Sequence, residues 1–209
     1  TFTADRKFPG IATSPRHWLR ASPDASQIAF LMKDDVGIVQ LWNVSPRGGE
    51  PRQITRNAIG IASAFSWSPD ATAITHVMDG SVCATAIATG QTRRLTERRA
   101  GAEAPLPYAC VFSPDGEQIA YEEARLGGVE TLALGDPTHP YRGASAMRYP
   151  RPGGRNADVR LGLIPATGGH TTWVEWDRAR YPYLCDVVWT KNAPLTLLVW
   201  LLIRAGTLL

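Results

Sequence analysis

A short turn motif recurs along the chain at a nearly constant distance. Its clearest copy is Ser113-Pro114-Asp115-Gly116, and two related copies begin at Ser22 and Ser68. The three serines lie 46 and 45 positions apart. A period of this size indicates a repeat architecture in which each unit is one supersecondary structure. The period therefore constrains the fold more strongly than any single motif.

The motif has the chemistry of a tight turn between two strands. Proline presets φ for the second position of a turn, aspartate can bind its own backbone two residues further on, and glycine tolerates positive φ. Apolar residues precede the turn, and Gln-Ile-Ala followed by an aromatic residue comes after it at 118–121 and 27–30. Each copy therefore predicts a β-hairpin.

Each period also predicts two further strands. Residues 39–44 and 81–86 read as strands, and a second repeated turn starts at Gly49 and Gly90, with a looser copy at Gly168. About four short antiparallel strands per period match one blade of a β-propeller. We predict an all-β fold, a partial β-propeller of about four blades. The alternative is a β-sandwich, which requires no fixed period.

We expect residues 1–209 to form a single propeller segment. The predicted blades are about 11–57, 58–98, 109–176 with an insertion at 135–156, and an incomplete 181–209. We expect an irregular connection at 100–108, a strand at 129–134 and a long loop for the insertion. Residues 1–5 resemble the last strand of a preceding blade. An open set of blades exposes strand edges and apolar faces. We therefore expect a part of a larger protein, or self-association through open blade edges.

The composition is that of a globular chain, with 44% hydrophobic and 20% charged residues. A net charge of +3 gives no reason to expect a nucleic-acid partner. The three cysteines, Cys83, Cys110 and Cys185, lack metal-site spacing and cannot make a full disulfide framework, although one bridge is open. We expect no cofactor and no metal.

No membrane segment or signal peptide is visible in the sequence. The longest apolar run, 195–203, is shorter than the ~20 residues that span a bilayer. The compartment is undetermined between periplasm and cytoplasm.

Two groups of charged residues are candidate ligand contacts. Arg148, Arg151 and Arg155 lie in the Pro/Gly-rich insertion, where they could bind an anionic partner or a carboxylate-bearing ligand. Alternatively, they pair with neighbouring blades. Glu122 and Glu123 follow the third turn motif and could hold a ligand as a pair, or lie solvated at a strand end.

Three weaker features have ordinary structural explanations. The four arginines at 93–94 and 98–99 could contact phosphates but are expected in a solvated loop. His17 is expected to bond within a loop beside an aromatic residue. The carboxylates at 34–35 have too few oxygen neighbours at the right spacing for calcium.

Two stretches of the chain resemble known families. Residues 1–122 resemble an uncharacterised bacterial family of TolB-like propellers, and the motifs that carry this likeness are residues 3–10, 15–18, 29–35 and 48–55. Residues 112–199 resemble the N-terminal β-propeller of dipeptidyl peptidase IV, and the motifs that carry that likeness are residues 112–116, 148–153, 156–162 and 183–189. The two likenesses meet near Tyr121, which implies a mosaic or a divergent propeller.

The second resemblance implies a propeller that gates access to a separate α/β-hydrolase domain of a serine exopeptidase. The nucleophile motif Gly-x-Ser-x-Gly is absent from the 209 residues, and 143–147 lacks the second glycine. That family holds the substrate's amino terminus with a Glu-Glu pair before the Ser-Pro-Asp-Gly strand, whereas Glu122 and Glu123 follow it.

The expected function is that of a non-catalytic propeller segment of a dipeptidyl-peptidase-IV-like serine peptidase, acting in substrate gating, with a hydrolase domain as its partner. The alternative is a TolB-like module that binds a protein or glycan partner. A truncated or recombined reading frame without its own function is the third possibility.

Overall fold

The computed structural model describes residues 19–99, 101, 104–151 and 153–200, which form sixteen strands. These residues contain no α-helix, and hence none that could cross a membrane. The predictions for residues 1–5, for His17 and for the end of the chain after Trp200 lie outside the described residues.

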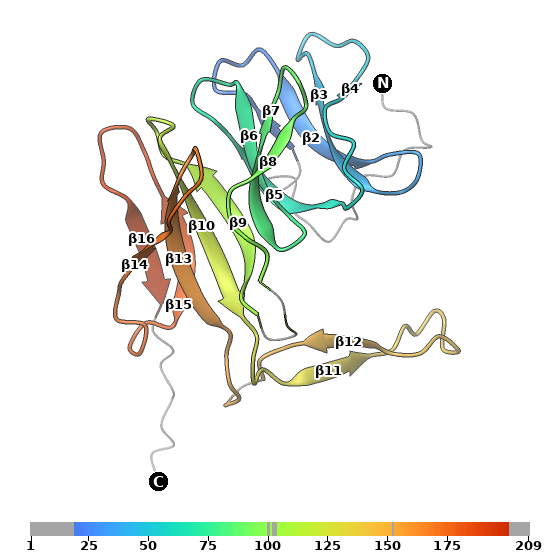
Figure 1. The fold of residues 1–209 in the computed structure, drawn as a ribbon. Coiled ribbons are helices and arrows are strands. Elements are labelled where there is room, and N and C mark those ends of the chain that lie inside the picture. Colours follow the sequence, from blue (N-terminus) through green and yellow to red (C-terminus); the bar gives the residue numbers. More distant parts are fainter. Residues whose placement is uncertain (1–18, 100, 102–103, 152, 201–209) are drawn as a thin grey trace.

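Most strands belong to three antiparallel four-stranded sheets (Figure 1). The first sheet contains β1 (Leu19–Ala21), β2 (Ile28–Lys33), β3 (Val39–Val44) and β4 (Arg52–Gln53). The second contains β5 (Ile61–Trp67), β6 (Ala73–Met78), β7 (Ser81–Ala86) and β8 (Thr92–Arg94). The third contains β9 (Leu106–Phe112), β10 (Gln118–Arg125), β13 (Asp158–Pro165) and β14 (Thr172–Val174).

Two hairpins complete the described part of the chain. A fourth sheet contains β15 (Tyr183–Val188) and β16 (Thr196–Trp200), and a separate hairpin contains β11 (Thr131–Leu134) and β12 (Ser145–Arg148). Figure 1 shows this β11–β12 hairpin projecting away from the packed sheets.

The repeated turn joins the first two strands of each four-stranded sheet, which confirms the predicted hairpins. In the third copy the Ser113 hydroxyl donates to the Asp115 carboxylate at 2.5 Å and accepts the Gln118 amide at 2.9 Å. The hydrogen bond from Ser113 lowers the pKa of Asp115. The copies at Ser22 and Ser68 repeat these bonds. The motif therefore has a structural role, because its side chains stabilise the turn of each hairpin.

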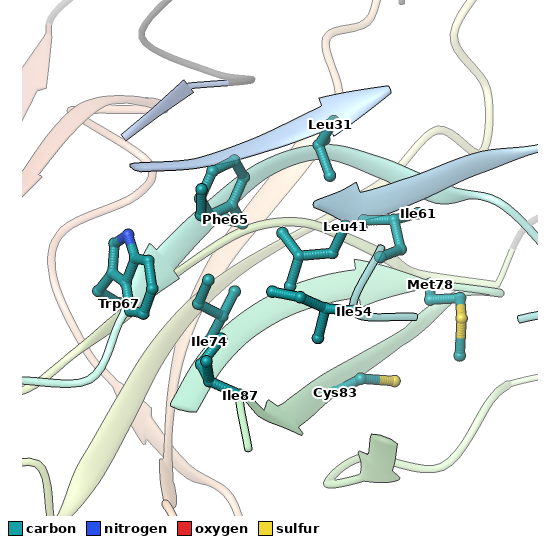
Figure 2. Close-up of a cluster of buried hydrophobic side chains, with 11 residues drawn as sticks. Leu31, Leu41, Ile54, Ile61, Phe65, Trp67, Ile74, Met78, Cys83 and Ile87 are labelled. Atoms are coloured by element: carbon teal, nitrogen blue, oxygen red, sulfur yellow. The ribbon is translucent and has the colours of Figure 1, made fainter. Parts of the chain in front are cut away.

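The sheets pack face to face because their middle strands are apolar on both faces. Along β6, Ile74 and Met78 point toward the first sheet, whereas Val77 on the opposite face joins the third sheet's core. Figure 2 shows the cluster between the first and second sheets, in which Phe65 and Leu41 are almost completely buried. Burial of both faces fixes the order and spacing of the sheets.

The third unit and the connection before it differ from their predictions in three places. The insertion at 135–156, expected as an irregular loop, contains β12, which pairs with β11. The strand predicted at 129–134 does not join the sheet, because β10 pairs with β13 along all of its eight residues and leaves no free edge there. The connection expected at 100–108 ends early, since β9 already begins at Leu106.

The three cysteines are free. Cys83 and Cys110 are buried, and burial raises the pKa of their thiols to about 11 and about 12. Because the thiolate is the reactive form, both side chains act as small core residues. Cys185 is exposed on β15.

Candidate functional site

Two of the cavities beside the third sheet are lined by the predicted glutamates. The inter-sheet cleft, about 710 Å³, lies between the second and third sheets. The inner-strand cavity, about 370 Å³, is lined by Arg20 of β1, Phe65 of β5, Cys110 of β9 and Asp186 of β15. Residues from the first strand of each of the three four-stranded sheets and of the β15–β16 sheet therefore line this cavity.

One wall of the inter-sheet cleft is a group of arginines held by one carboxylate. Asp79 accepts a 2.7 Å bond from Arg94 and forms a 2.9 Å ion pair with Arg98. It lies in the Asp-Gly turn between β6 and β7, at a φ of 50°, a left-handed conformation that aspartate tolerates in such turns. The hydrogen bond from Arg94 is the main cause that lowers the pKa of Asp79, so this carboxylate is ionised.

The facing wall belongs to the third sheet. Glu123 of β10 is buried, and its carboxylate lies 3.3 Å from the Arg99 guanidinium. Beside it, Tyr121 and Trp173 meet edge to face with ring centroids 5.8 Å apart. The Tyr121 hydroxyl bonds Thr171 at 2.9 Å. The cleft thus combines exposed cations, one buried carboxylate and an aromatic pair.

The inner-strand cavity is organised around Glu122. The Tyr108 hydroxyl donates to its carboxylate at 2.6 Å. The β9–β10 register shifts at this point, so that Tyr108 is an extra residue on β9, and such bulges commonly re-aim a side chain. Burial, followed by the negative charge of Asp186, raises the pKa of Glu122, while the Tyr108 hydrogen bond opposes the shift.

The two predicted glutamates do not share a cavity. Glu122 lines the inner-strand cavity and Glu123 the inter-sheet cleft. The pairing of β10 with β13 is regular through both positions, so the two side chains point to opposite faces of the sheet. Each glutamate therefore has to be considered as a separate contact.

The three predicted arginines lie at the base of the β11–β12 hairpin. Arg148 donates to the Val129 carbonyl at 2.7 Å, and Arg151 forms a 3.4 Å ion pair with Glu130. A Cβ built on Gly128 would lie 2.9 Å from the side chain of Arg155, which therefore covers that glycine. Within the described ranges these arginines make no ion pair with Glu122 or Glu123. Their role as ligand contacts stays a prediction.

The arginines at 93–99 are held in place by specific partners. Besides the ion pairs of the cleft, Arg93 donates at 2.9 Å to the carbonyl oxygens of Ala166 and Thr167, which ties β8 to the third sheet. The Asp34 carboxylate accepts the amide of Ile38 and an amide N–H of Gln40, so it closes the β2–β3 hairpin. In the described part of the chain, no group of three or more His, Cys, Asp or Glu side chains is placed to hold a metal ion.

Several residues that line or support these two cavities were not predicted from the sequence. Asp79 had a usable signal for its position, because Asp-Gly between two strands marks a hairpin turn. No sequence signal marked the other three residues, Tyr108, Trp173 and Asp186. Each of them interacts with a residue of β10 that lies more than ten positions away along the chain.

A family model described as "Dipeptidyl peptidase IV (DPP IV) N-terminal region" matches residues 39–206. The chain belongs to this family. The match of the dipeptidyl peptidase IV N-terminal region begins well before residue 112 and crosses the Ser113 turn, so the family covers much of the stretch that also resembles TolB-like propellers.

A solved structure confirms the all-β propeller fold. Porphyromonas gingivalis dipeptidyl peptidase 4 superposes with a TM-score of 0.66 at 14% identity, covering 91% of this chain and 37% of that chain. A TolB structure from Agrobacterium tumefaciens matches with a TM-score of 0.43 at 23% identity, over 79% of this chain and 67% of that chain. At these identities the likeness to dipeptidyl peptidase 4 shows the fold.

A sequence relative is considerably closer in identity. The uncharacterized protein YidR of Escherichia coli (strain K12) is 48% identical over 123 residues, which is 59% of this chain and 29% of YidR. The chain thus spans less than a third of YidR and little more than a third of the peptidase. It is a β-propeller segment of the dipeptidyl peptidase IV N-terminal family.

Proposed function

We propose that this chain is the non-catalytic propeller segment of a dipeptidyl peptidase IV-like serine peptidase, and that it gates and positions peptide substrates for a hydrolase domain. The family match over residues 39–206 carries the proposal. The fold of Porphyromonas gingivalis dipeptidyl peptidase 4, which covers 91% of this chain, is consistent with it.

The chemistry of such a peptidase would come from residues beyond these 209. The nearest approach to a nucleophile motif, Gly143 to Met147, lacks its second glycine. Ser145 begins strand β12 of the projecting hairpin, whereas a nucleophile elbow places its serine between a strand and a helix.

The inner-strand cavity is the place where gating would act. A peptide passing along the first strands would meet the carboxylates of Glu122 and Asp186 and the guanidinium of Arg20. Burial and the negative charge of Asp186 hold the pKa of Glu122 above its ordinary value, because both disfavour the ionised form of this carboxyl group. Its charge would help to select which peptides pass.

The reading frame that encodes the chain provides the first test. We expect an α/β-hydrolase domain with a Gly-x-Ser-x-Gly elbow after the propeller. A frame that contains only further Ser-Pro-Asp-Gly units would contradict the proposal.

Kinetics of the full-length protein provide the second test. In Glu122→Gln we expect a raised KM for Xaa-Pro dipeptide p-nitroanilides with kcat within about twofold of the unmodified enzyme, since a gating residue binds substrate and transition state alike. Glu117→Gln, on the exposed third turn, is the matched control and should change neither constant. The 209-residue chain alone should hydrolyse none of these substrates.

The second candidate function is a TolB-like module that binds a protein or glycan partner, and the polar inter-sheet cleft favours it. Its partner could also be a second copy of the chain, because Leu198 and Trp200 on β16 are 58% and 71% exposed. Light scattering at rising concentration would show a mass above the monomer if the open face associates, and a constant monomer mass would argue against self-association.

A further inference from the structure

We propose that the inter-sheet cleft binds a side-chain carboxylate of an acidic peptide, with Arg98 and Arg99 as its receptors. The carboxylate chemistry follows from the cleft itself, whereas the peptide as its source rests on the proposed function. This site is separate from the inner-strand cavity, because the two cavities lie on opposite faces of β10.

Most of the exposed charges of the cleft are positive, and Glu97 is its exposed carboxylate. The side chains of Arg94, Arg98 and Arg99 are 46%, 63% and 48% exposed, whereas those of their partners Asp79 and Glu123 are 14% and 5% exposed. A molecule that enters the cleft therefore meets mainly guanidinium groups. Asp79 and Glu123 are less exposed and hold these groups in position.

These guanidinium groups keep donors for a ligand. A guanidinium carries five N–H donors. Arg98 uses one terminal nitrogen for Asp79 and Arg99 uses one for Glu123, and neither makes another side-chain hydrogen bond or ion pair within the described residues. Because the ion pairs already restrict both side chains, binding a carboxylate costs less conformational entropy than it would on free surface arginines.

The remaining lining suits the stem of an acidic side chain. Ile164, Tyr121 and Trp173 supply apolar surface deeper in the cleft, and the methylene groups of a glutamate could pack there. A volume of about 710 Å³ lies within the range of ligand pockets. Glu97 is the remaining carboxylate of the lining, and it is exposed and makes no ion pair in the described chain.

The net charge still favours an anion. Arg160 stacks on Trp173 with its guanidinium carbon 3.8 Å from the ring centroid. Arg160 itself is not among the lining residues, which carry three guanidinium groups, from Arg94, Arg98 and Arg99, against two carboxylates, from Glu97 and Glu123. The carboxylate of Asp79, which holds two of these arginines, lies outside the lining.

Calorimetric titration of the whole chain with triglutamate tests the proposal, with triglutamine as the neutral probe. We expect triglutamate to bind and triglutamine not to bind. Arg98→Gln should weaken triglutamate binding at least tenfold. The control Arg47→Gln replaces an exposed arginine that makes no ion pair with the other described residues, and it should change binding less than twofold. Circular dichroism spectra and melting curves confirm that each variant is folded.

Arg99 needs a paired substitution, because its removal alone leaves Glu123 buried without a partner. In Arg99→Gln/Glu123→Gln we expect the same tenfold loss. Equal affinities of the unmodified chain and Arg98→Gln for triglutamate would overturn the proposed site. Binding of triglutamine as tight as that of triglutamate would also overturn it. Tighter binding of trigalacturonate than of triglutamate would overturn the peptide class. None of these results touches the gating proposal, which depends on the reading frame and the Xaa-Pro kinetics.

Discussion

Gly162 tests the packing that forms the aromatic wall of the inter-sheet cleft. It lies on β13 directly opposite Tyr121 and Trp173 on the neighbouring strands. A Cβ at this position would lie 2.7 Å from Thr171 Cγ2 and 2.8 Å from Cε1 and Cζ of Tyr121. Carbon atoms prefer separations of about 3.5–4.0 Å. In Gly162→Ala, the Tyr121 ring or the Thr171 loop must therefore move by about 1 Å.

The cost of this movement follows from the surroundings of the Tyr121 ring. The ring is 3% exposed, and its hydroxyl is bonded to Thr171, so it has little room to turn. Overpacking of this kind costs about 1–3 kcal/mol, and replacing a strand glycine by alanine recovers about 0.5–1 kcal/mol of backbone entropy. We expect a net loss of about 1–2 kcal/mol, equivalent to a melting temperature lower by about 2–8 °C for a chain of this size.

Thermal unfolding followed by far-UV circular dichroism measures this shift. Gly143→Ala is the matched control, because a Cβ there has no neighbour within 4 Å, and it should change the free energy of unfolding by less than about 0.5 kcal/mol. Equal melting temperatures for the two variants would refute the close packing of β13 against Tyr121.

Two further predictions concern stability. His76 is completely buried, its Nε2 bonds Thr85 at 2.8 Å, and burial lowers its pKa from 6.5 to about 4. The unfolded chain therefore binds a proton that the folded chain excludes, so stability is full above pH 6.5 and falls toward pH 4 by about 3 kcal/mol. Urea unfolding at pH 7.5 and pH 5 should show this loss, and a His76→Gln variant with the same pH dependence would exclude His76 as its source. Ser113→Ala removes the hydroxyl that bonds the Asp115 carboxylate and the Gln118 amide, so we expect a loss of about 1–3 kcal/mol in urea unfolding. The exposed Ser45→Ala serves as control, and an equal midpoint for both would contradict a structural role of the turn hydroxyl.

The turn repeat allowed much of the fold to be predicted. The hydrogen bonds of Ser113, Asp115 and Gln118 span only five residues, so their chemistry is local and can be read from the order of the residues. The alternation of apolar residues beside each turn then predicted the strands, because successive side chains in a strand point to opposite faces. The hairpins, the strands at 39–44 and 81–86 and the four-strand period were accessible in this way.

The insertion after β10 shows a feature that local sequence patterns did not predict. Its proline and glycine content predicted a loop, but β12 pairs with β11 across an intervening turn region. The apolar stretch that includes β11 looked like a sheet strand, yet β13 occupies the only edge of β10 that it could have joined. Which of two strands pairs with a given sheet edge depends on how each strand packs. The sequence pattern of either strand alone does not predict that choice.

The sequence by itself determined the repeat, the hairpins and the family, because each of these depends on short motifs whose residues are close together along the chain. Only the tertiary structure decided the sites. It placed Glu122 and Glu123 in different cavities, and it turned arginines expected in a solvated loop into a cluster anchored by Asp79 and Glu123. These contacts join separate strands and sheets, so they exist only after the second and third sheets have packed together.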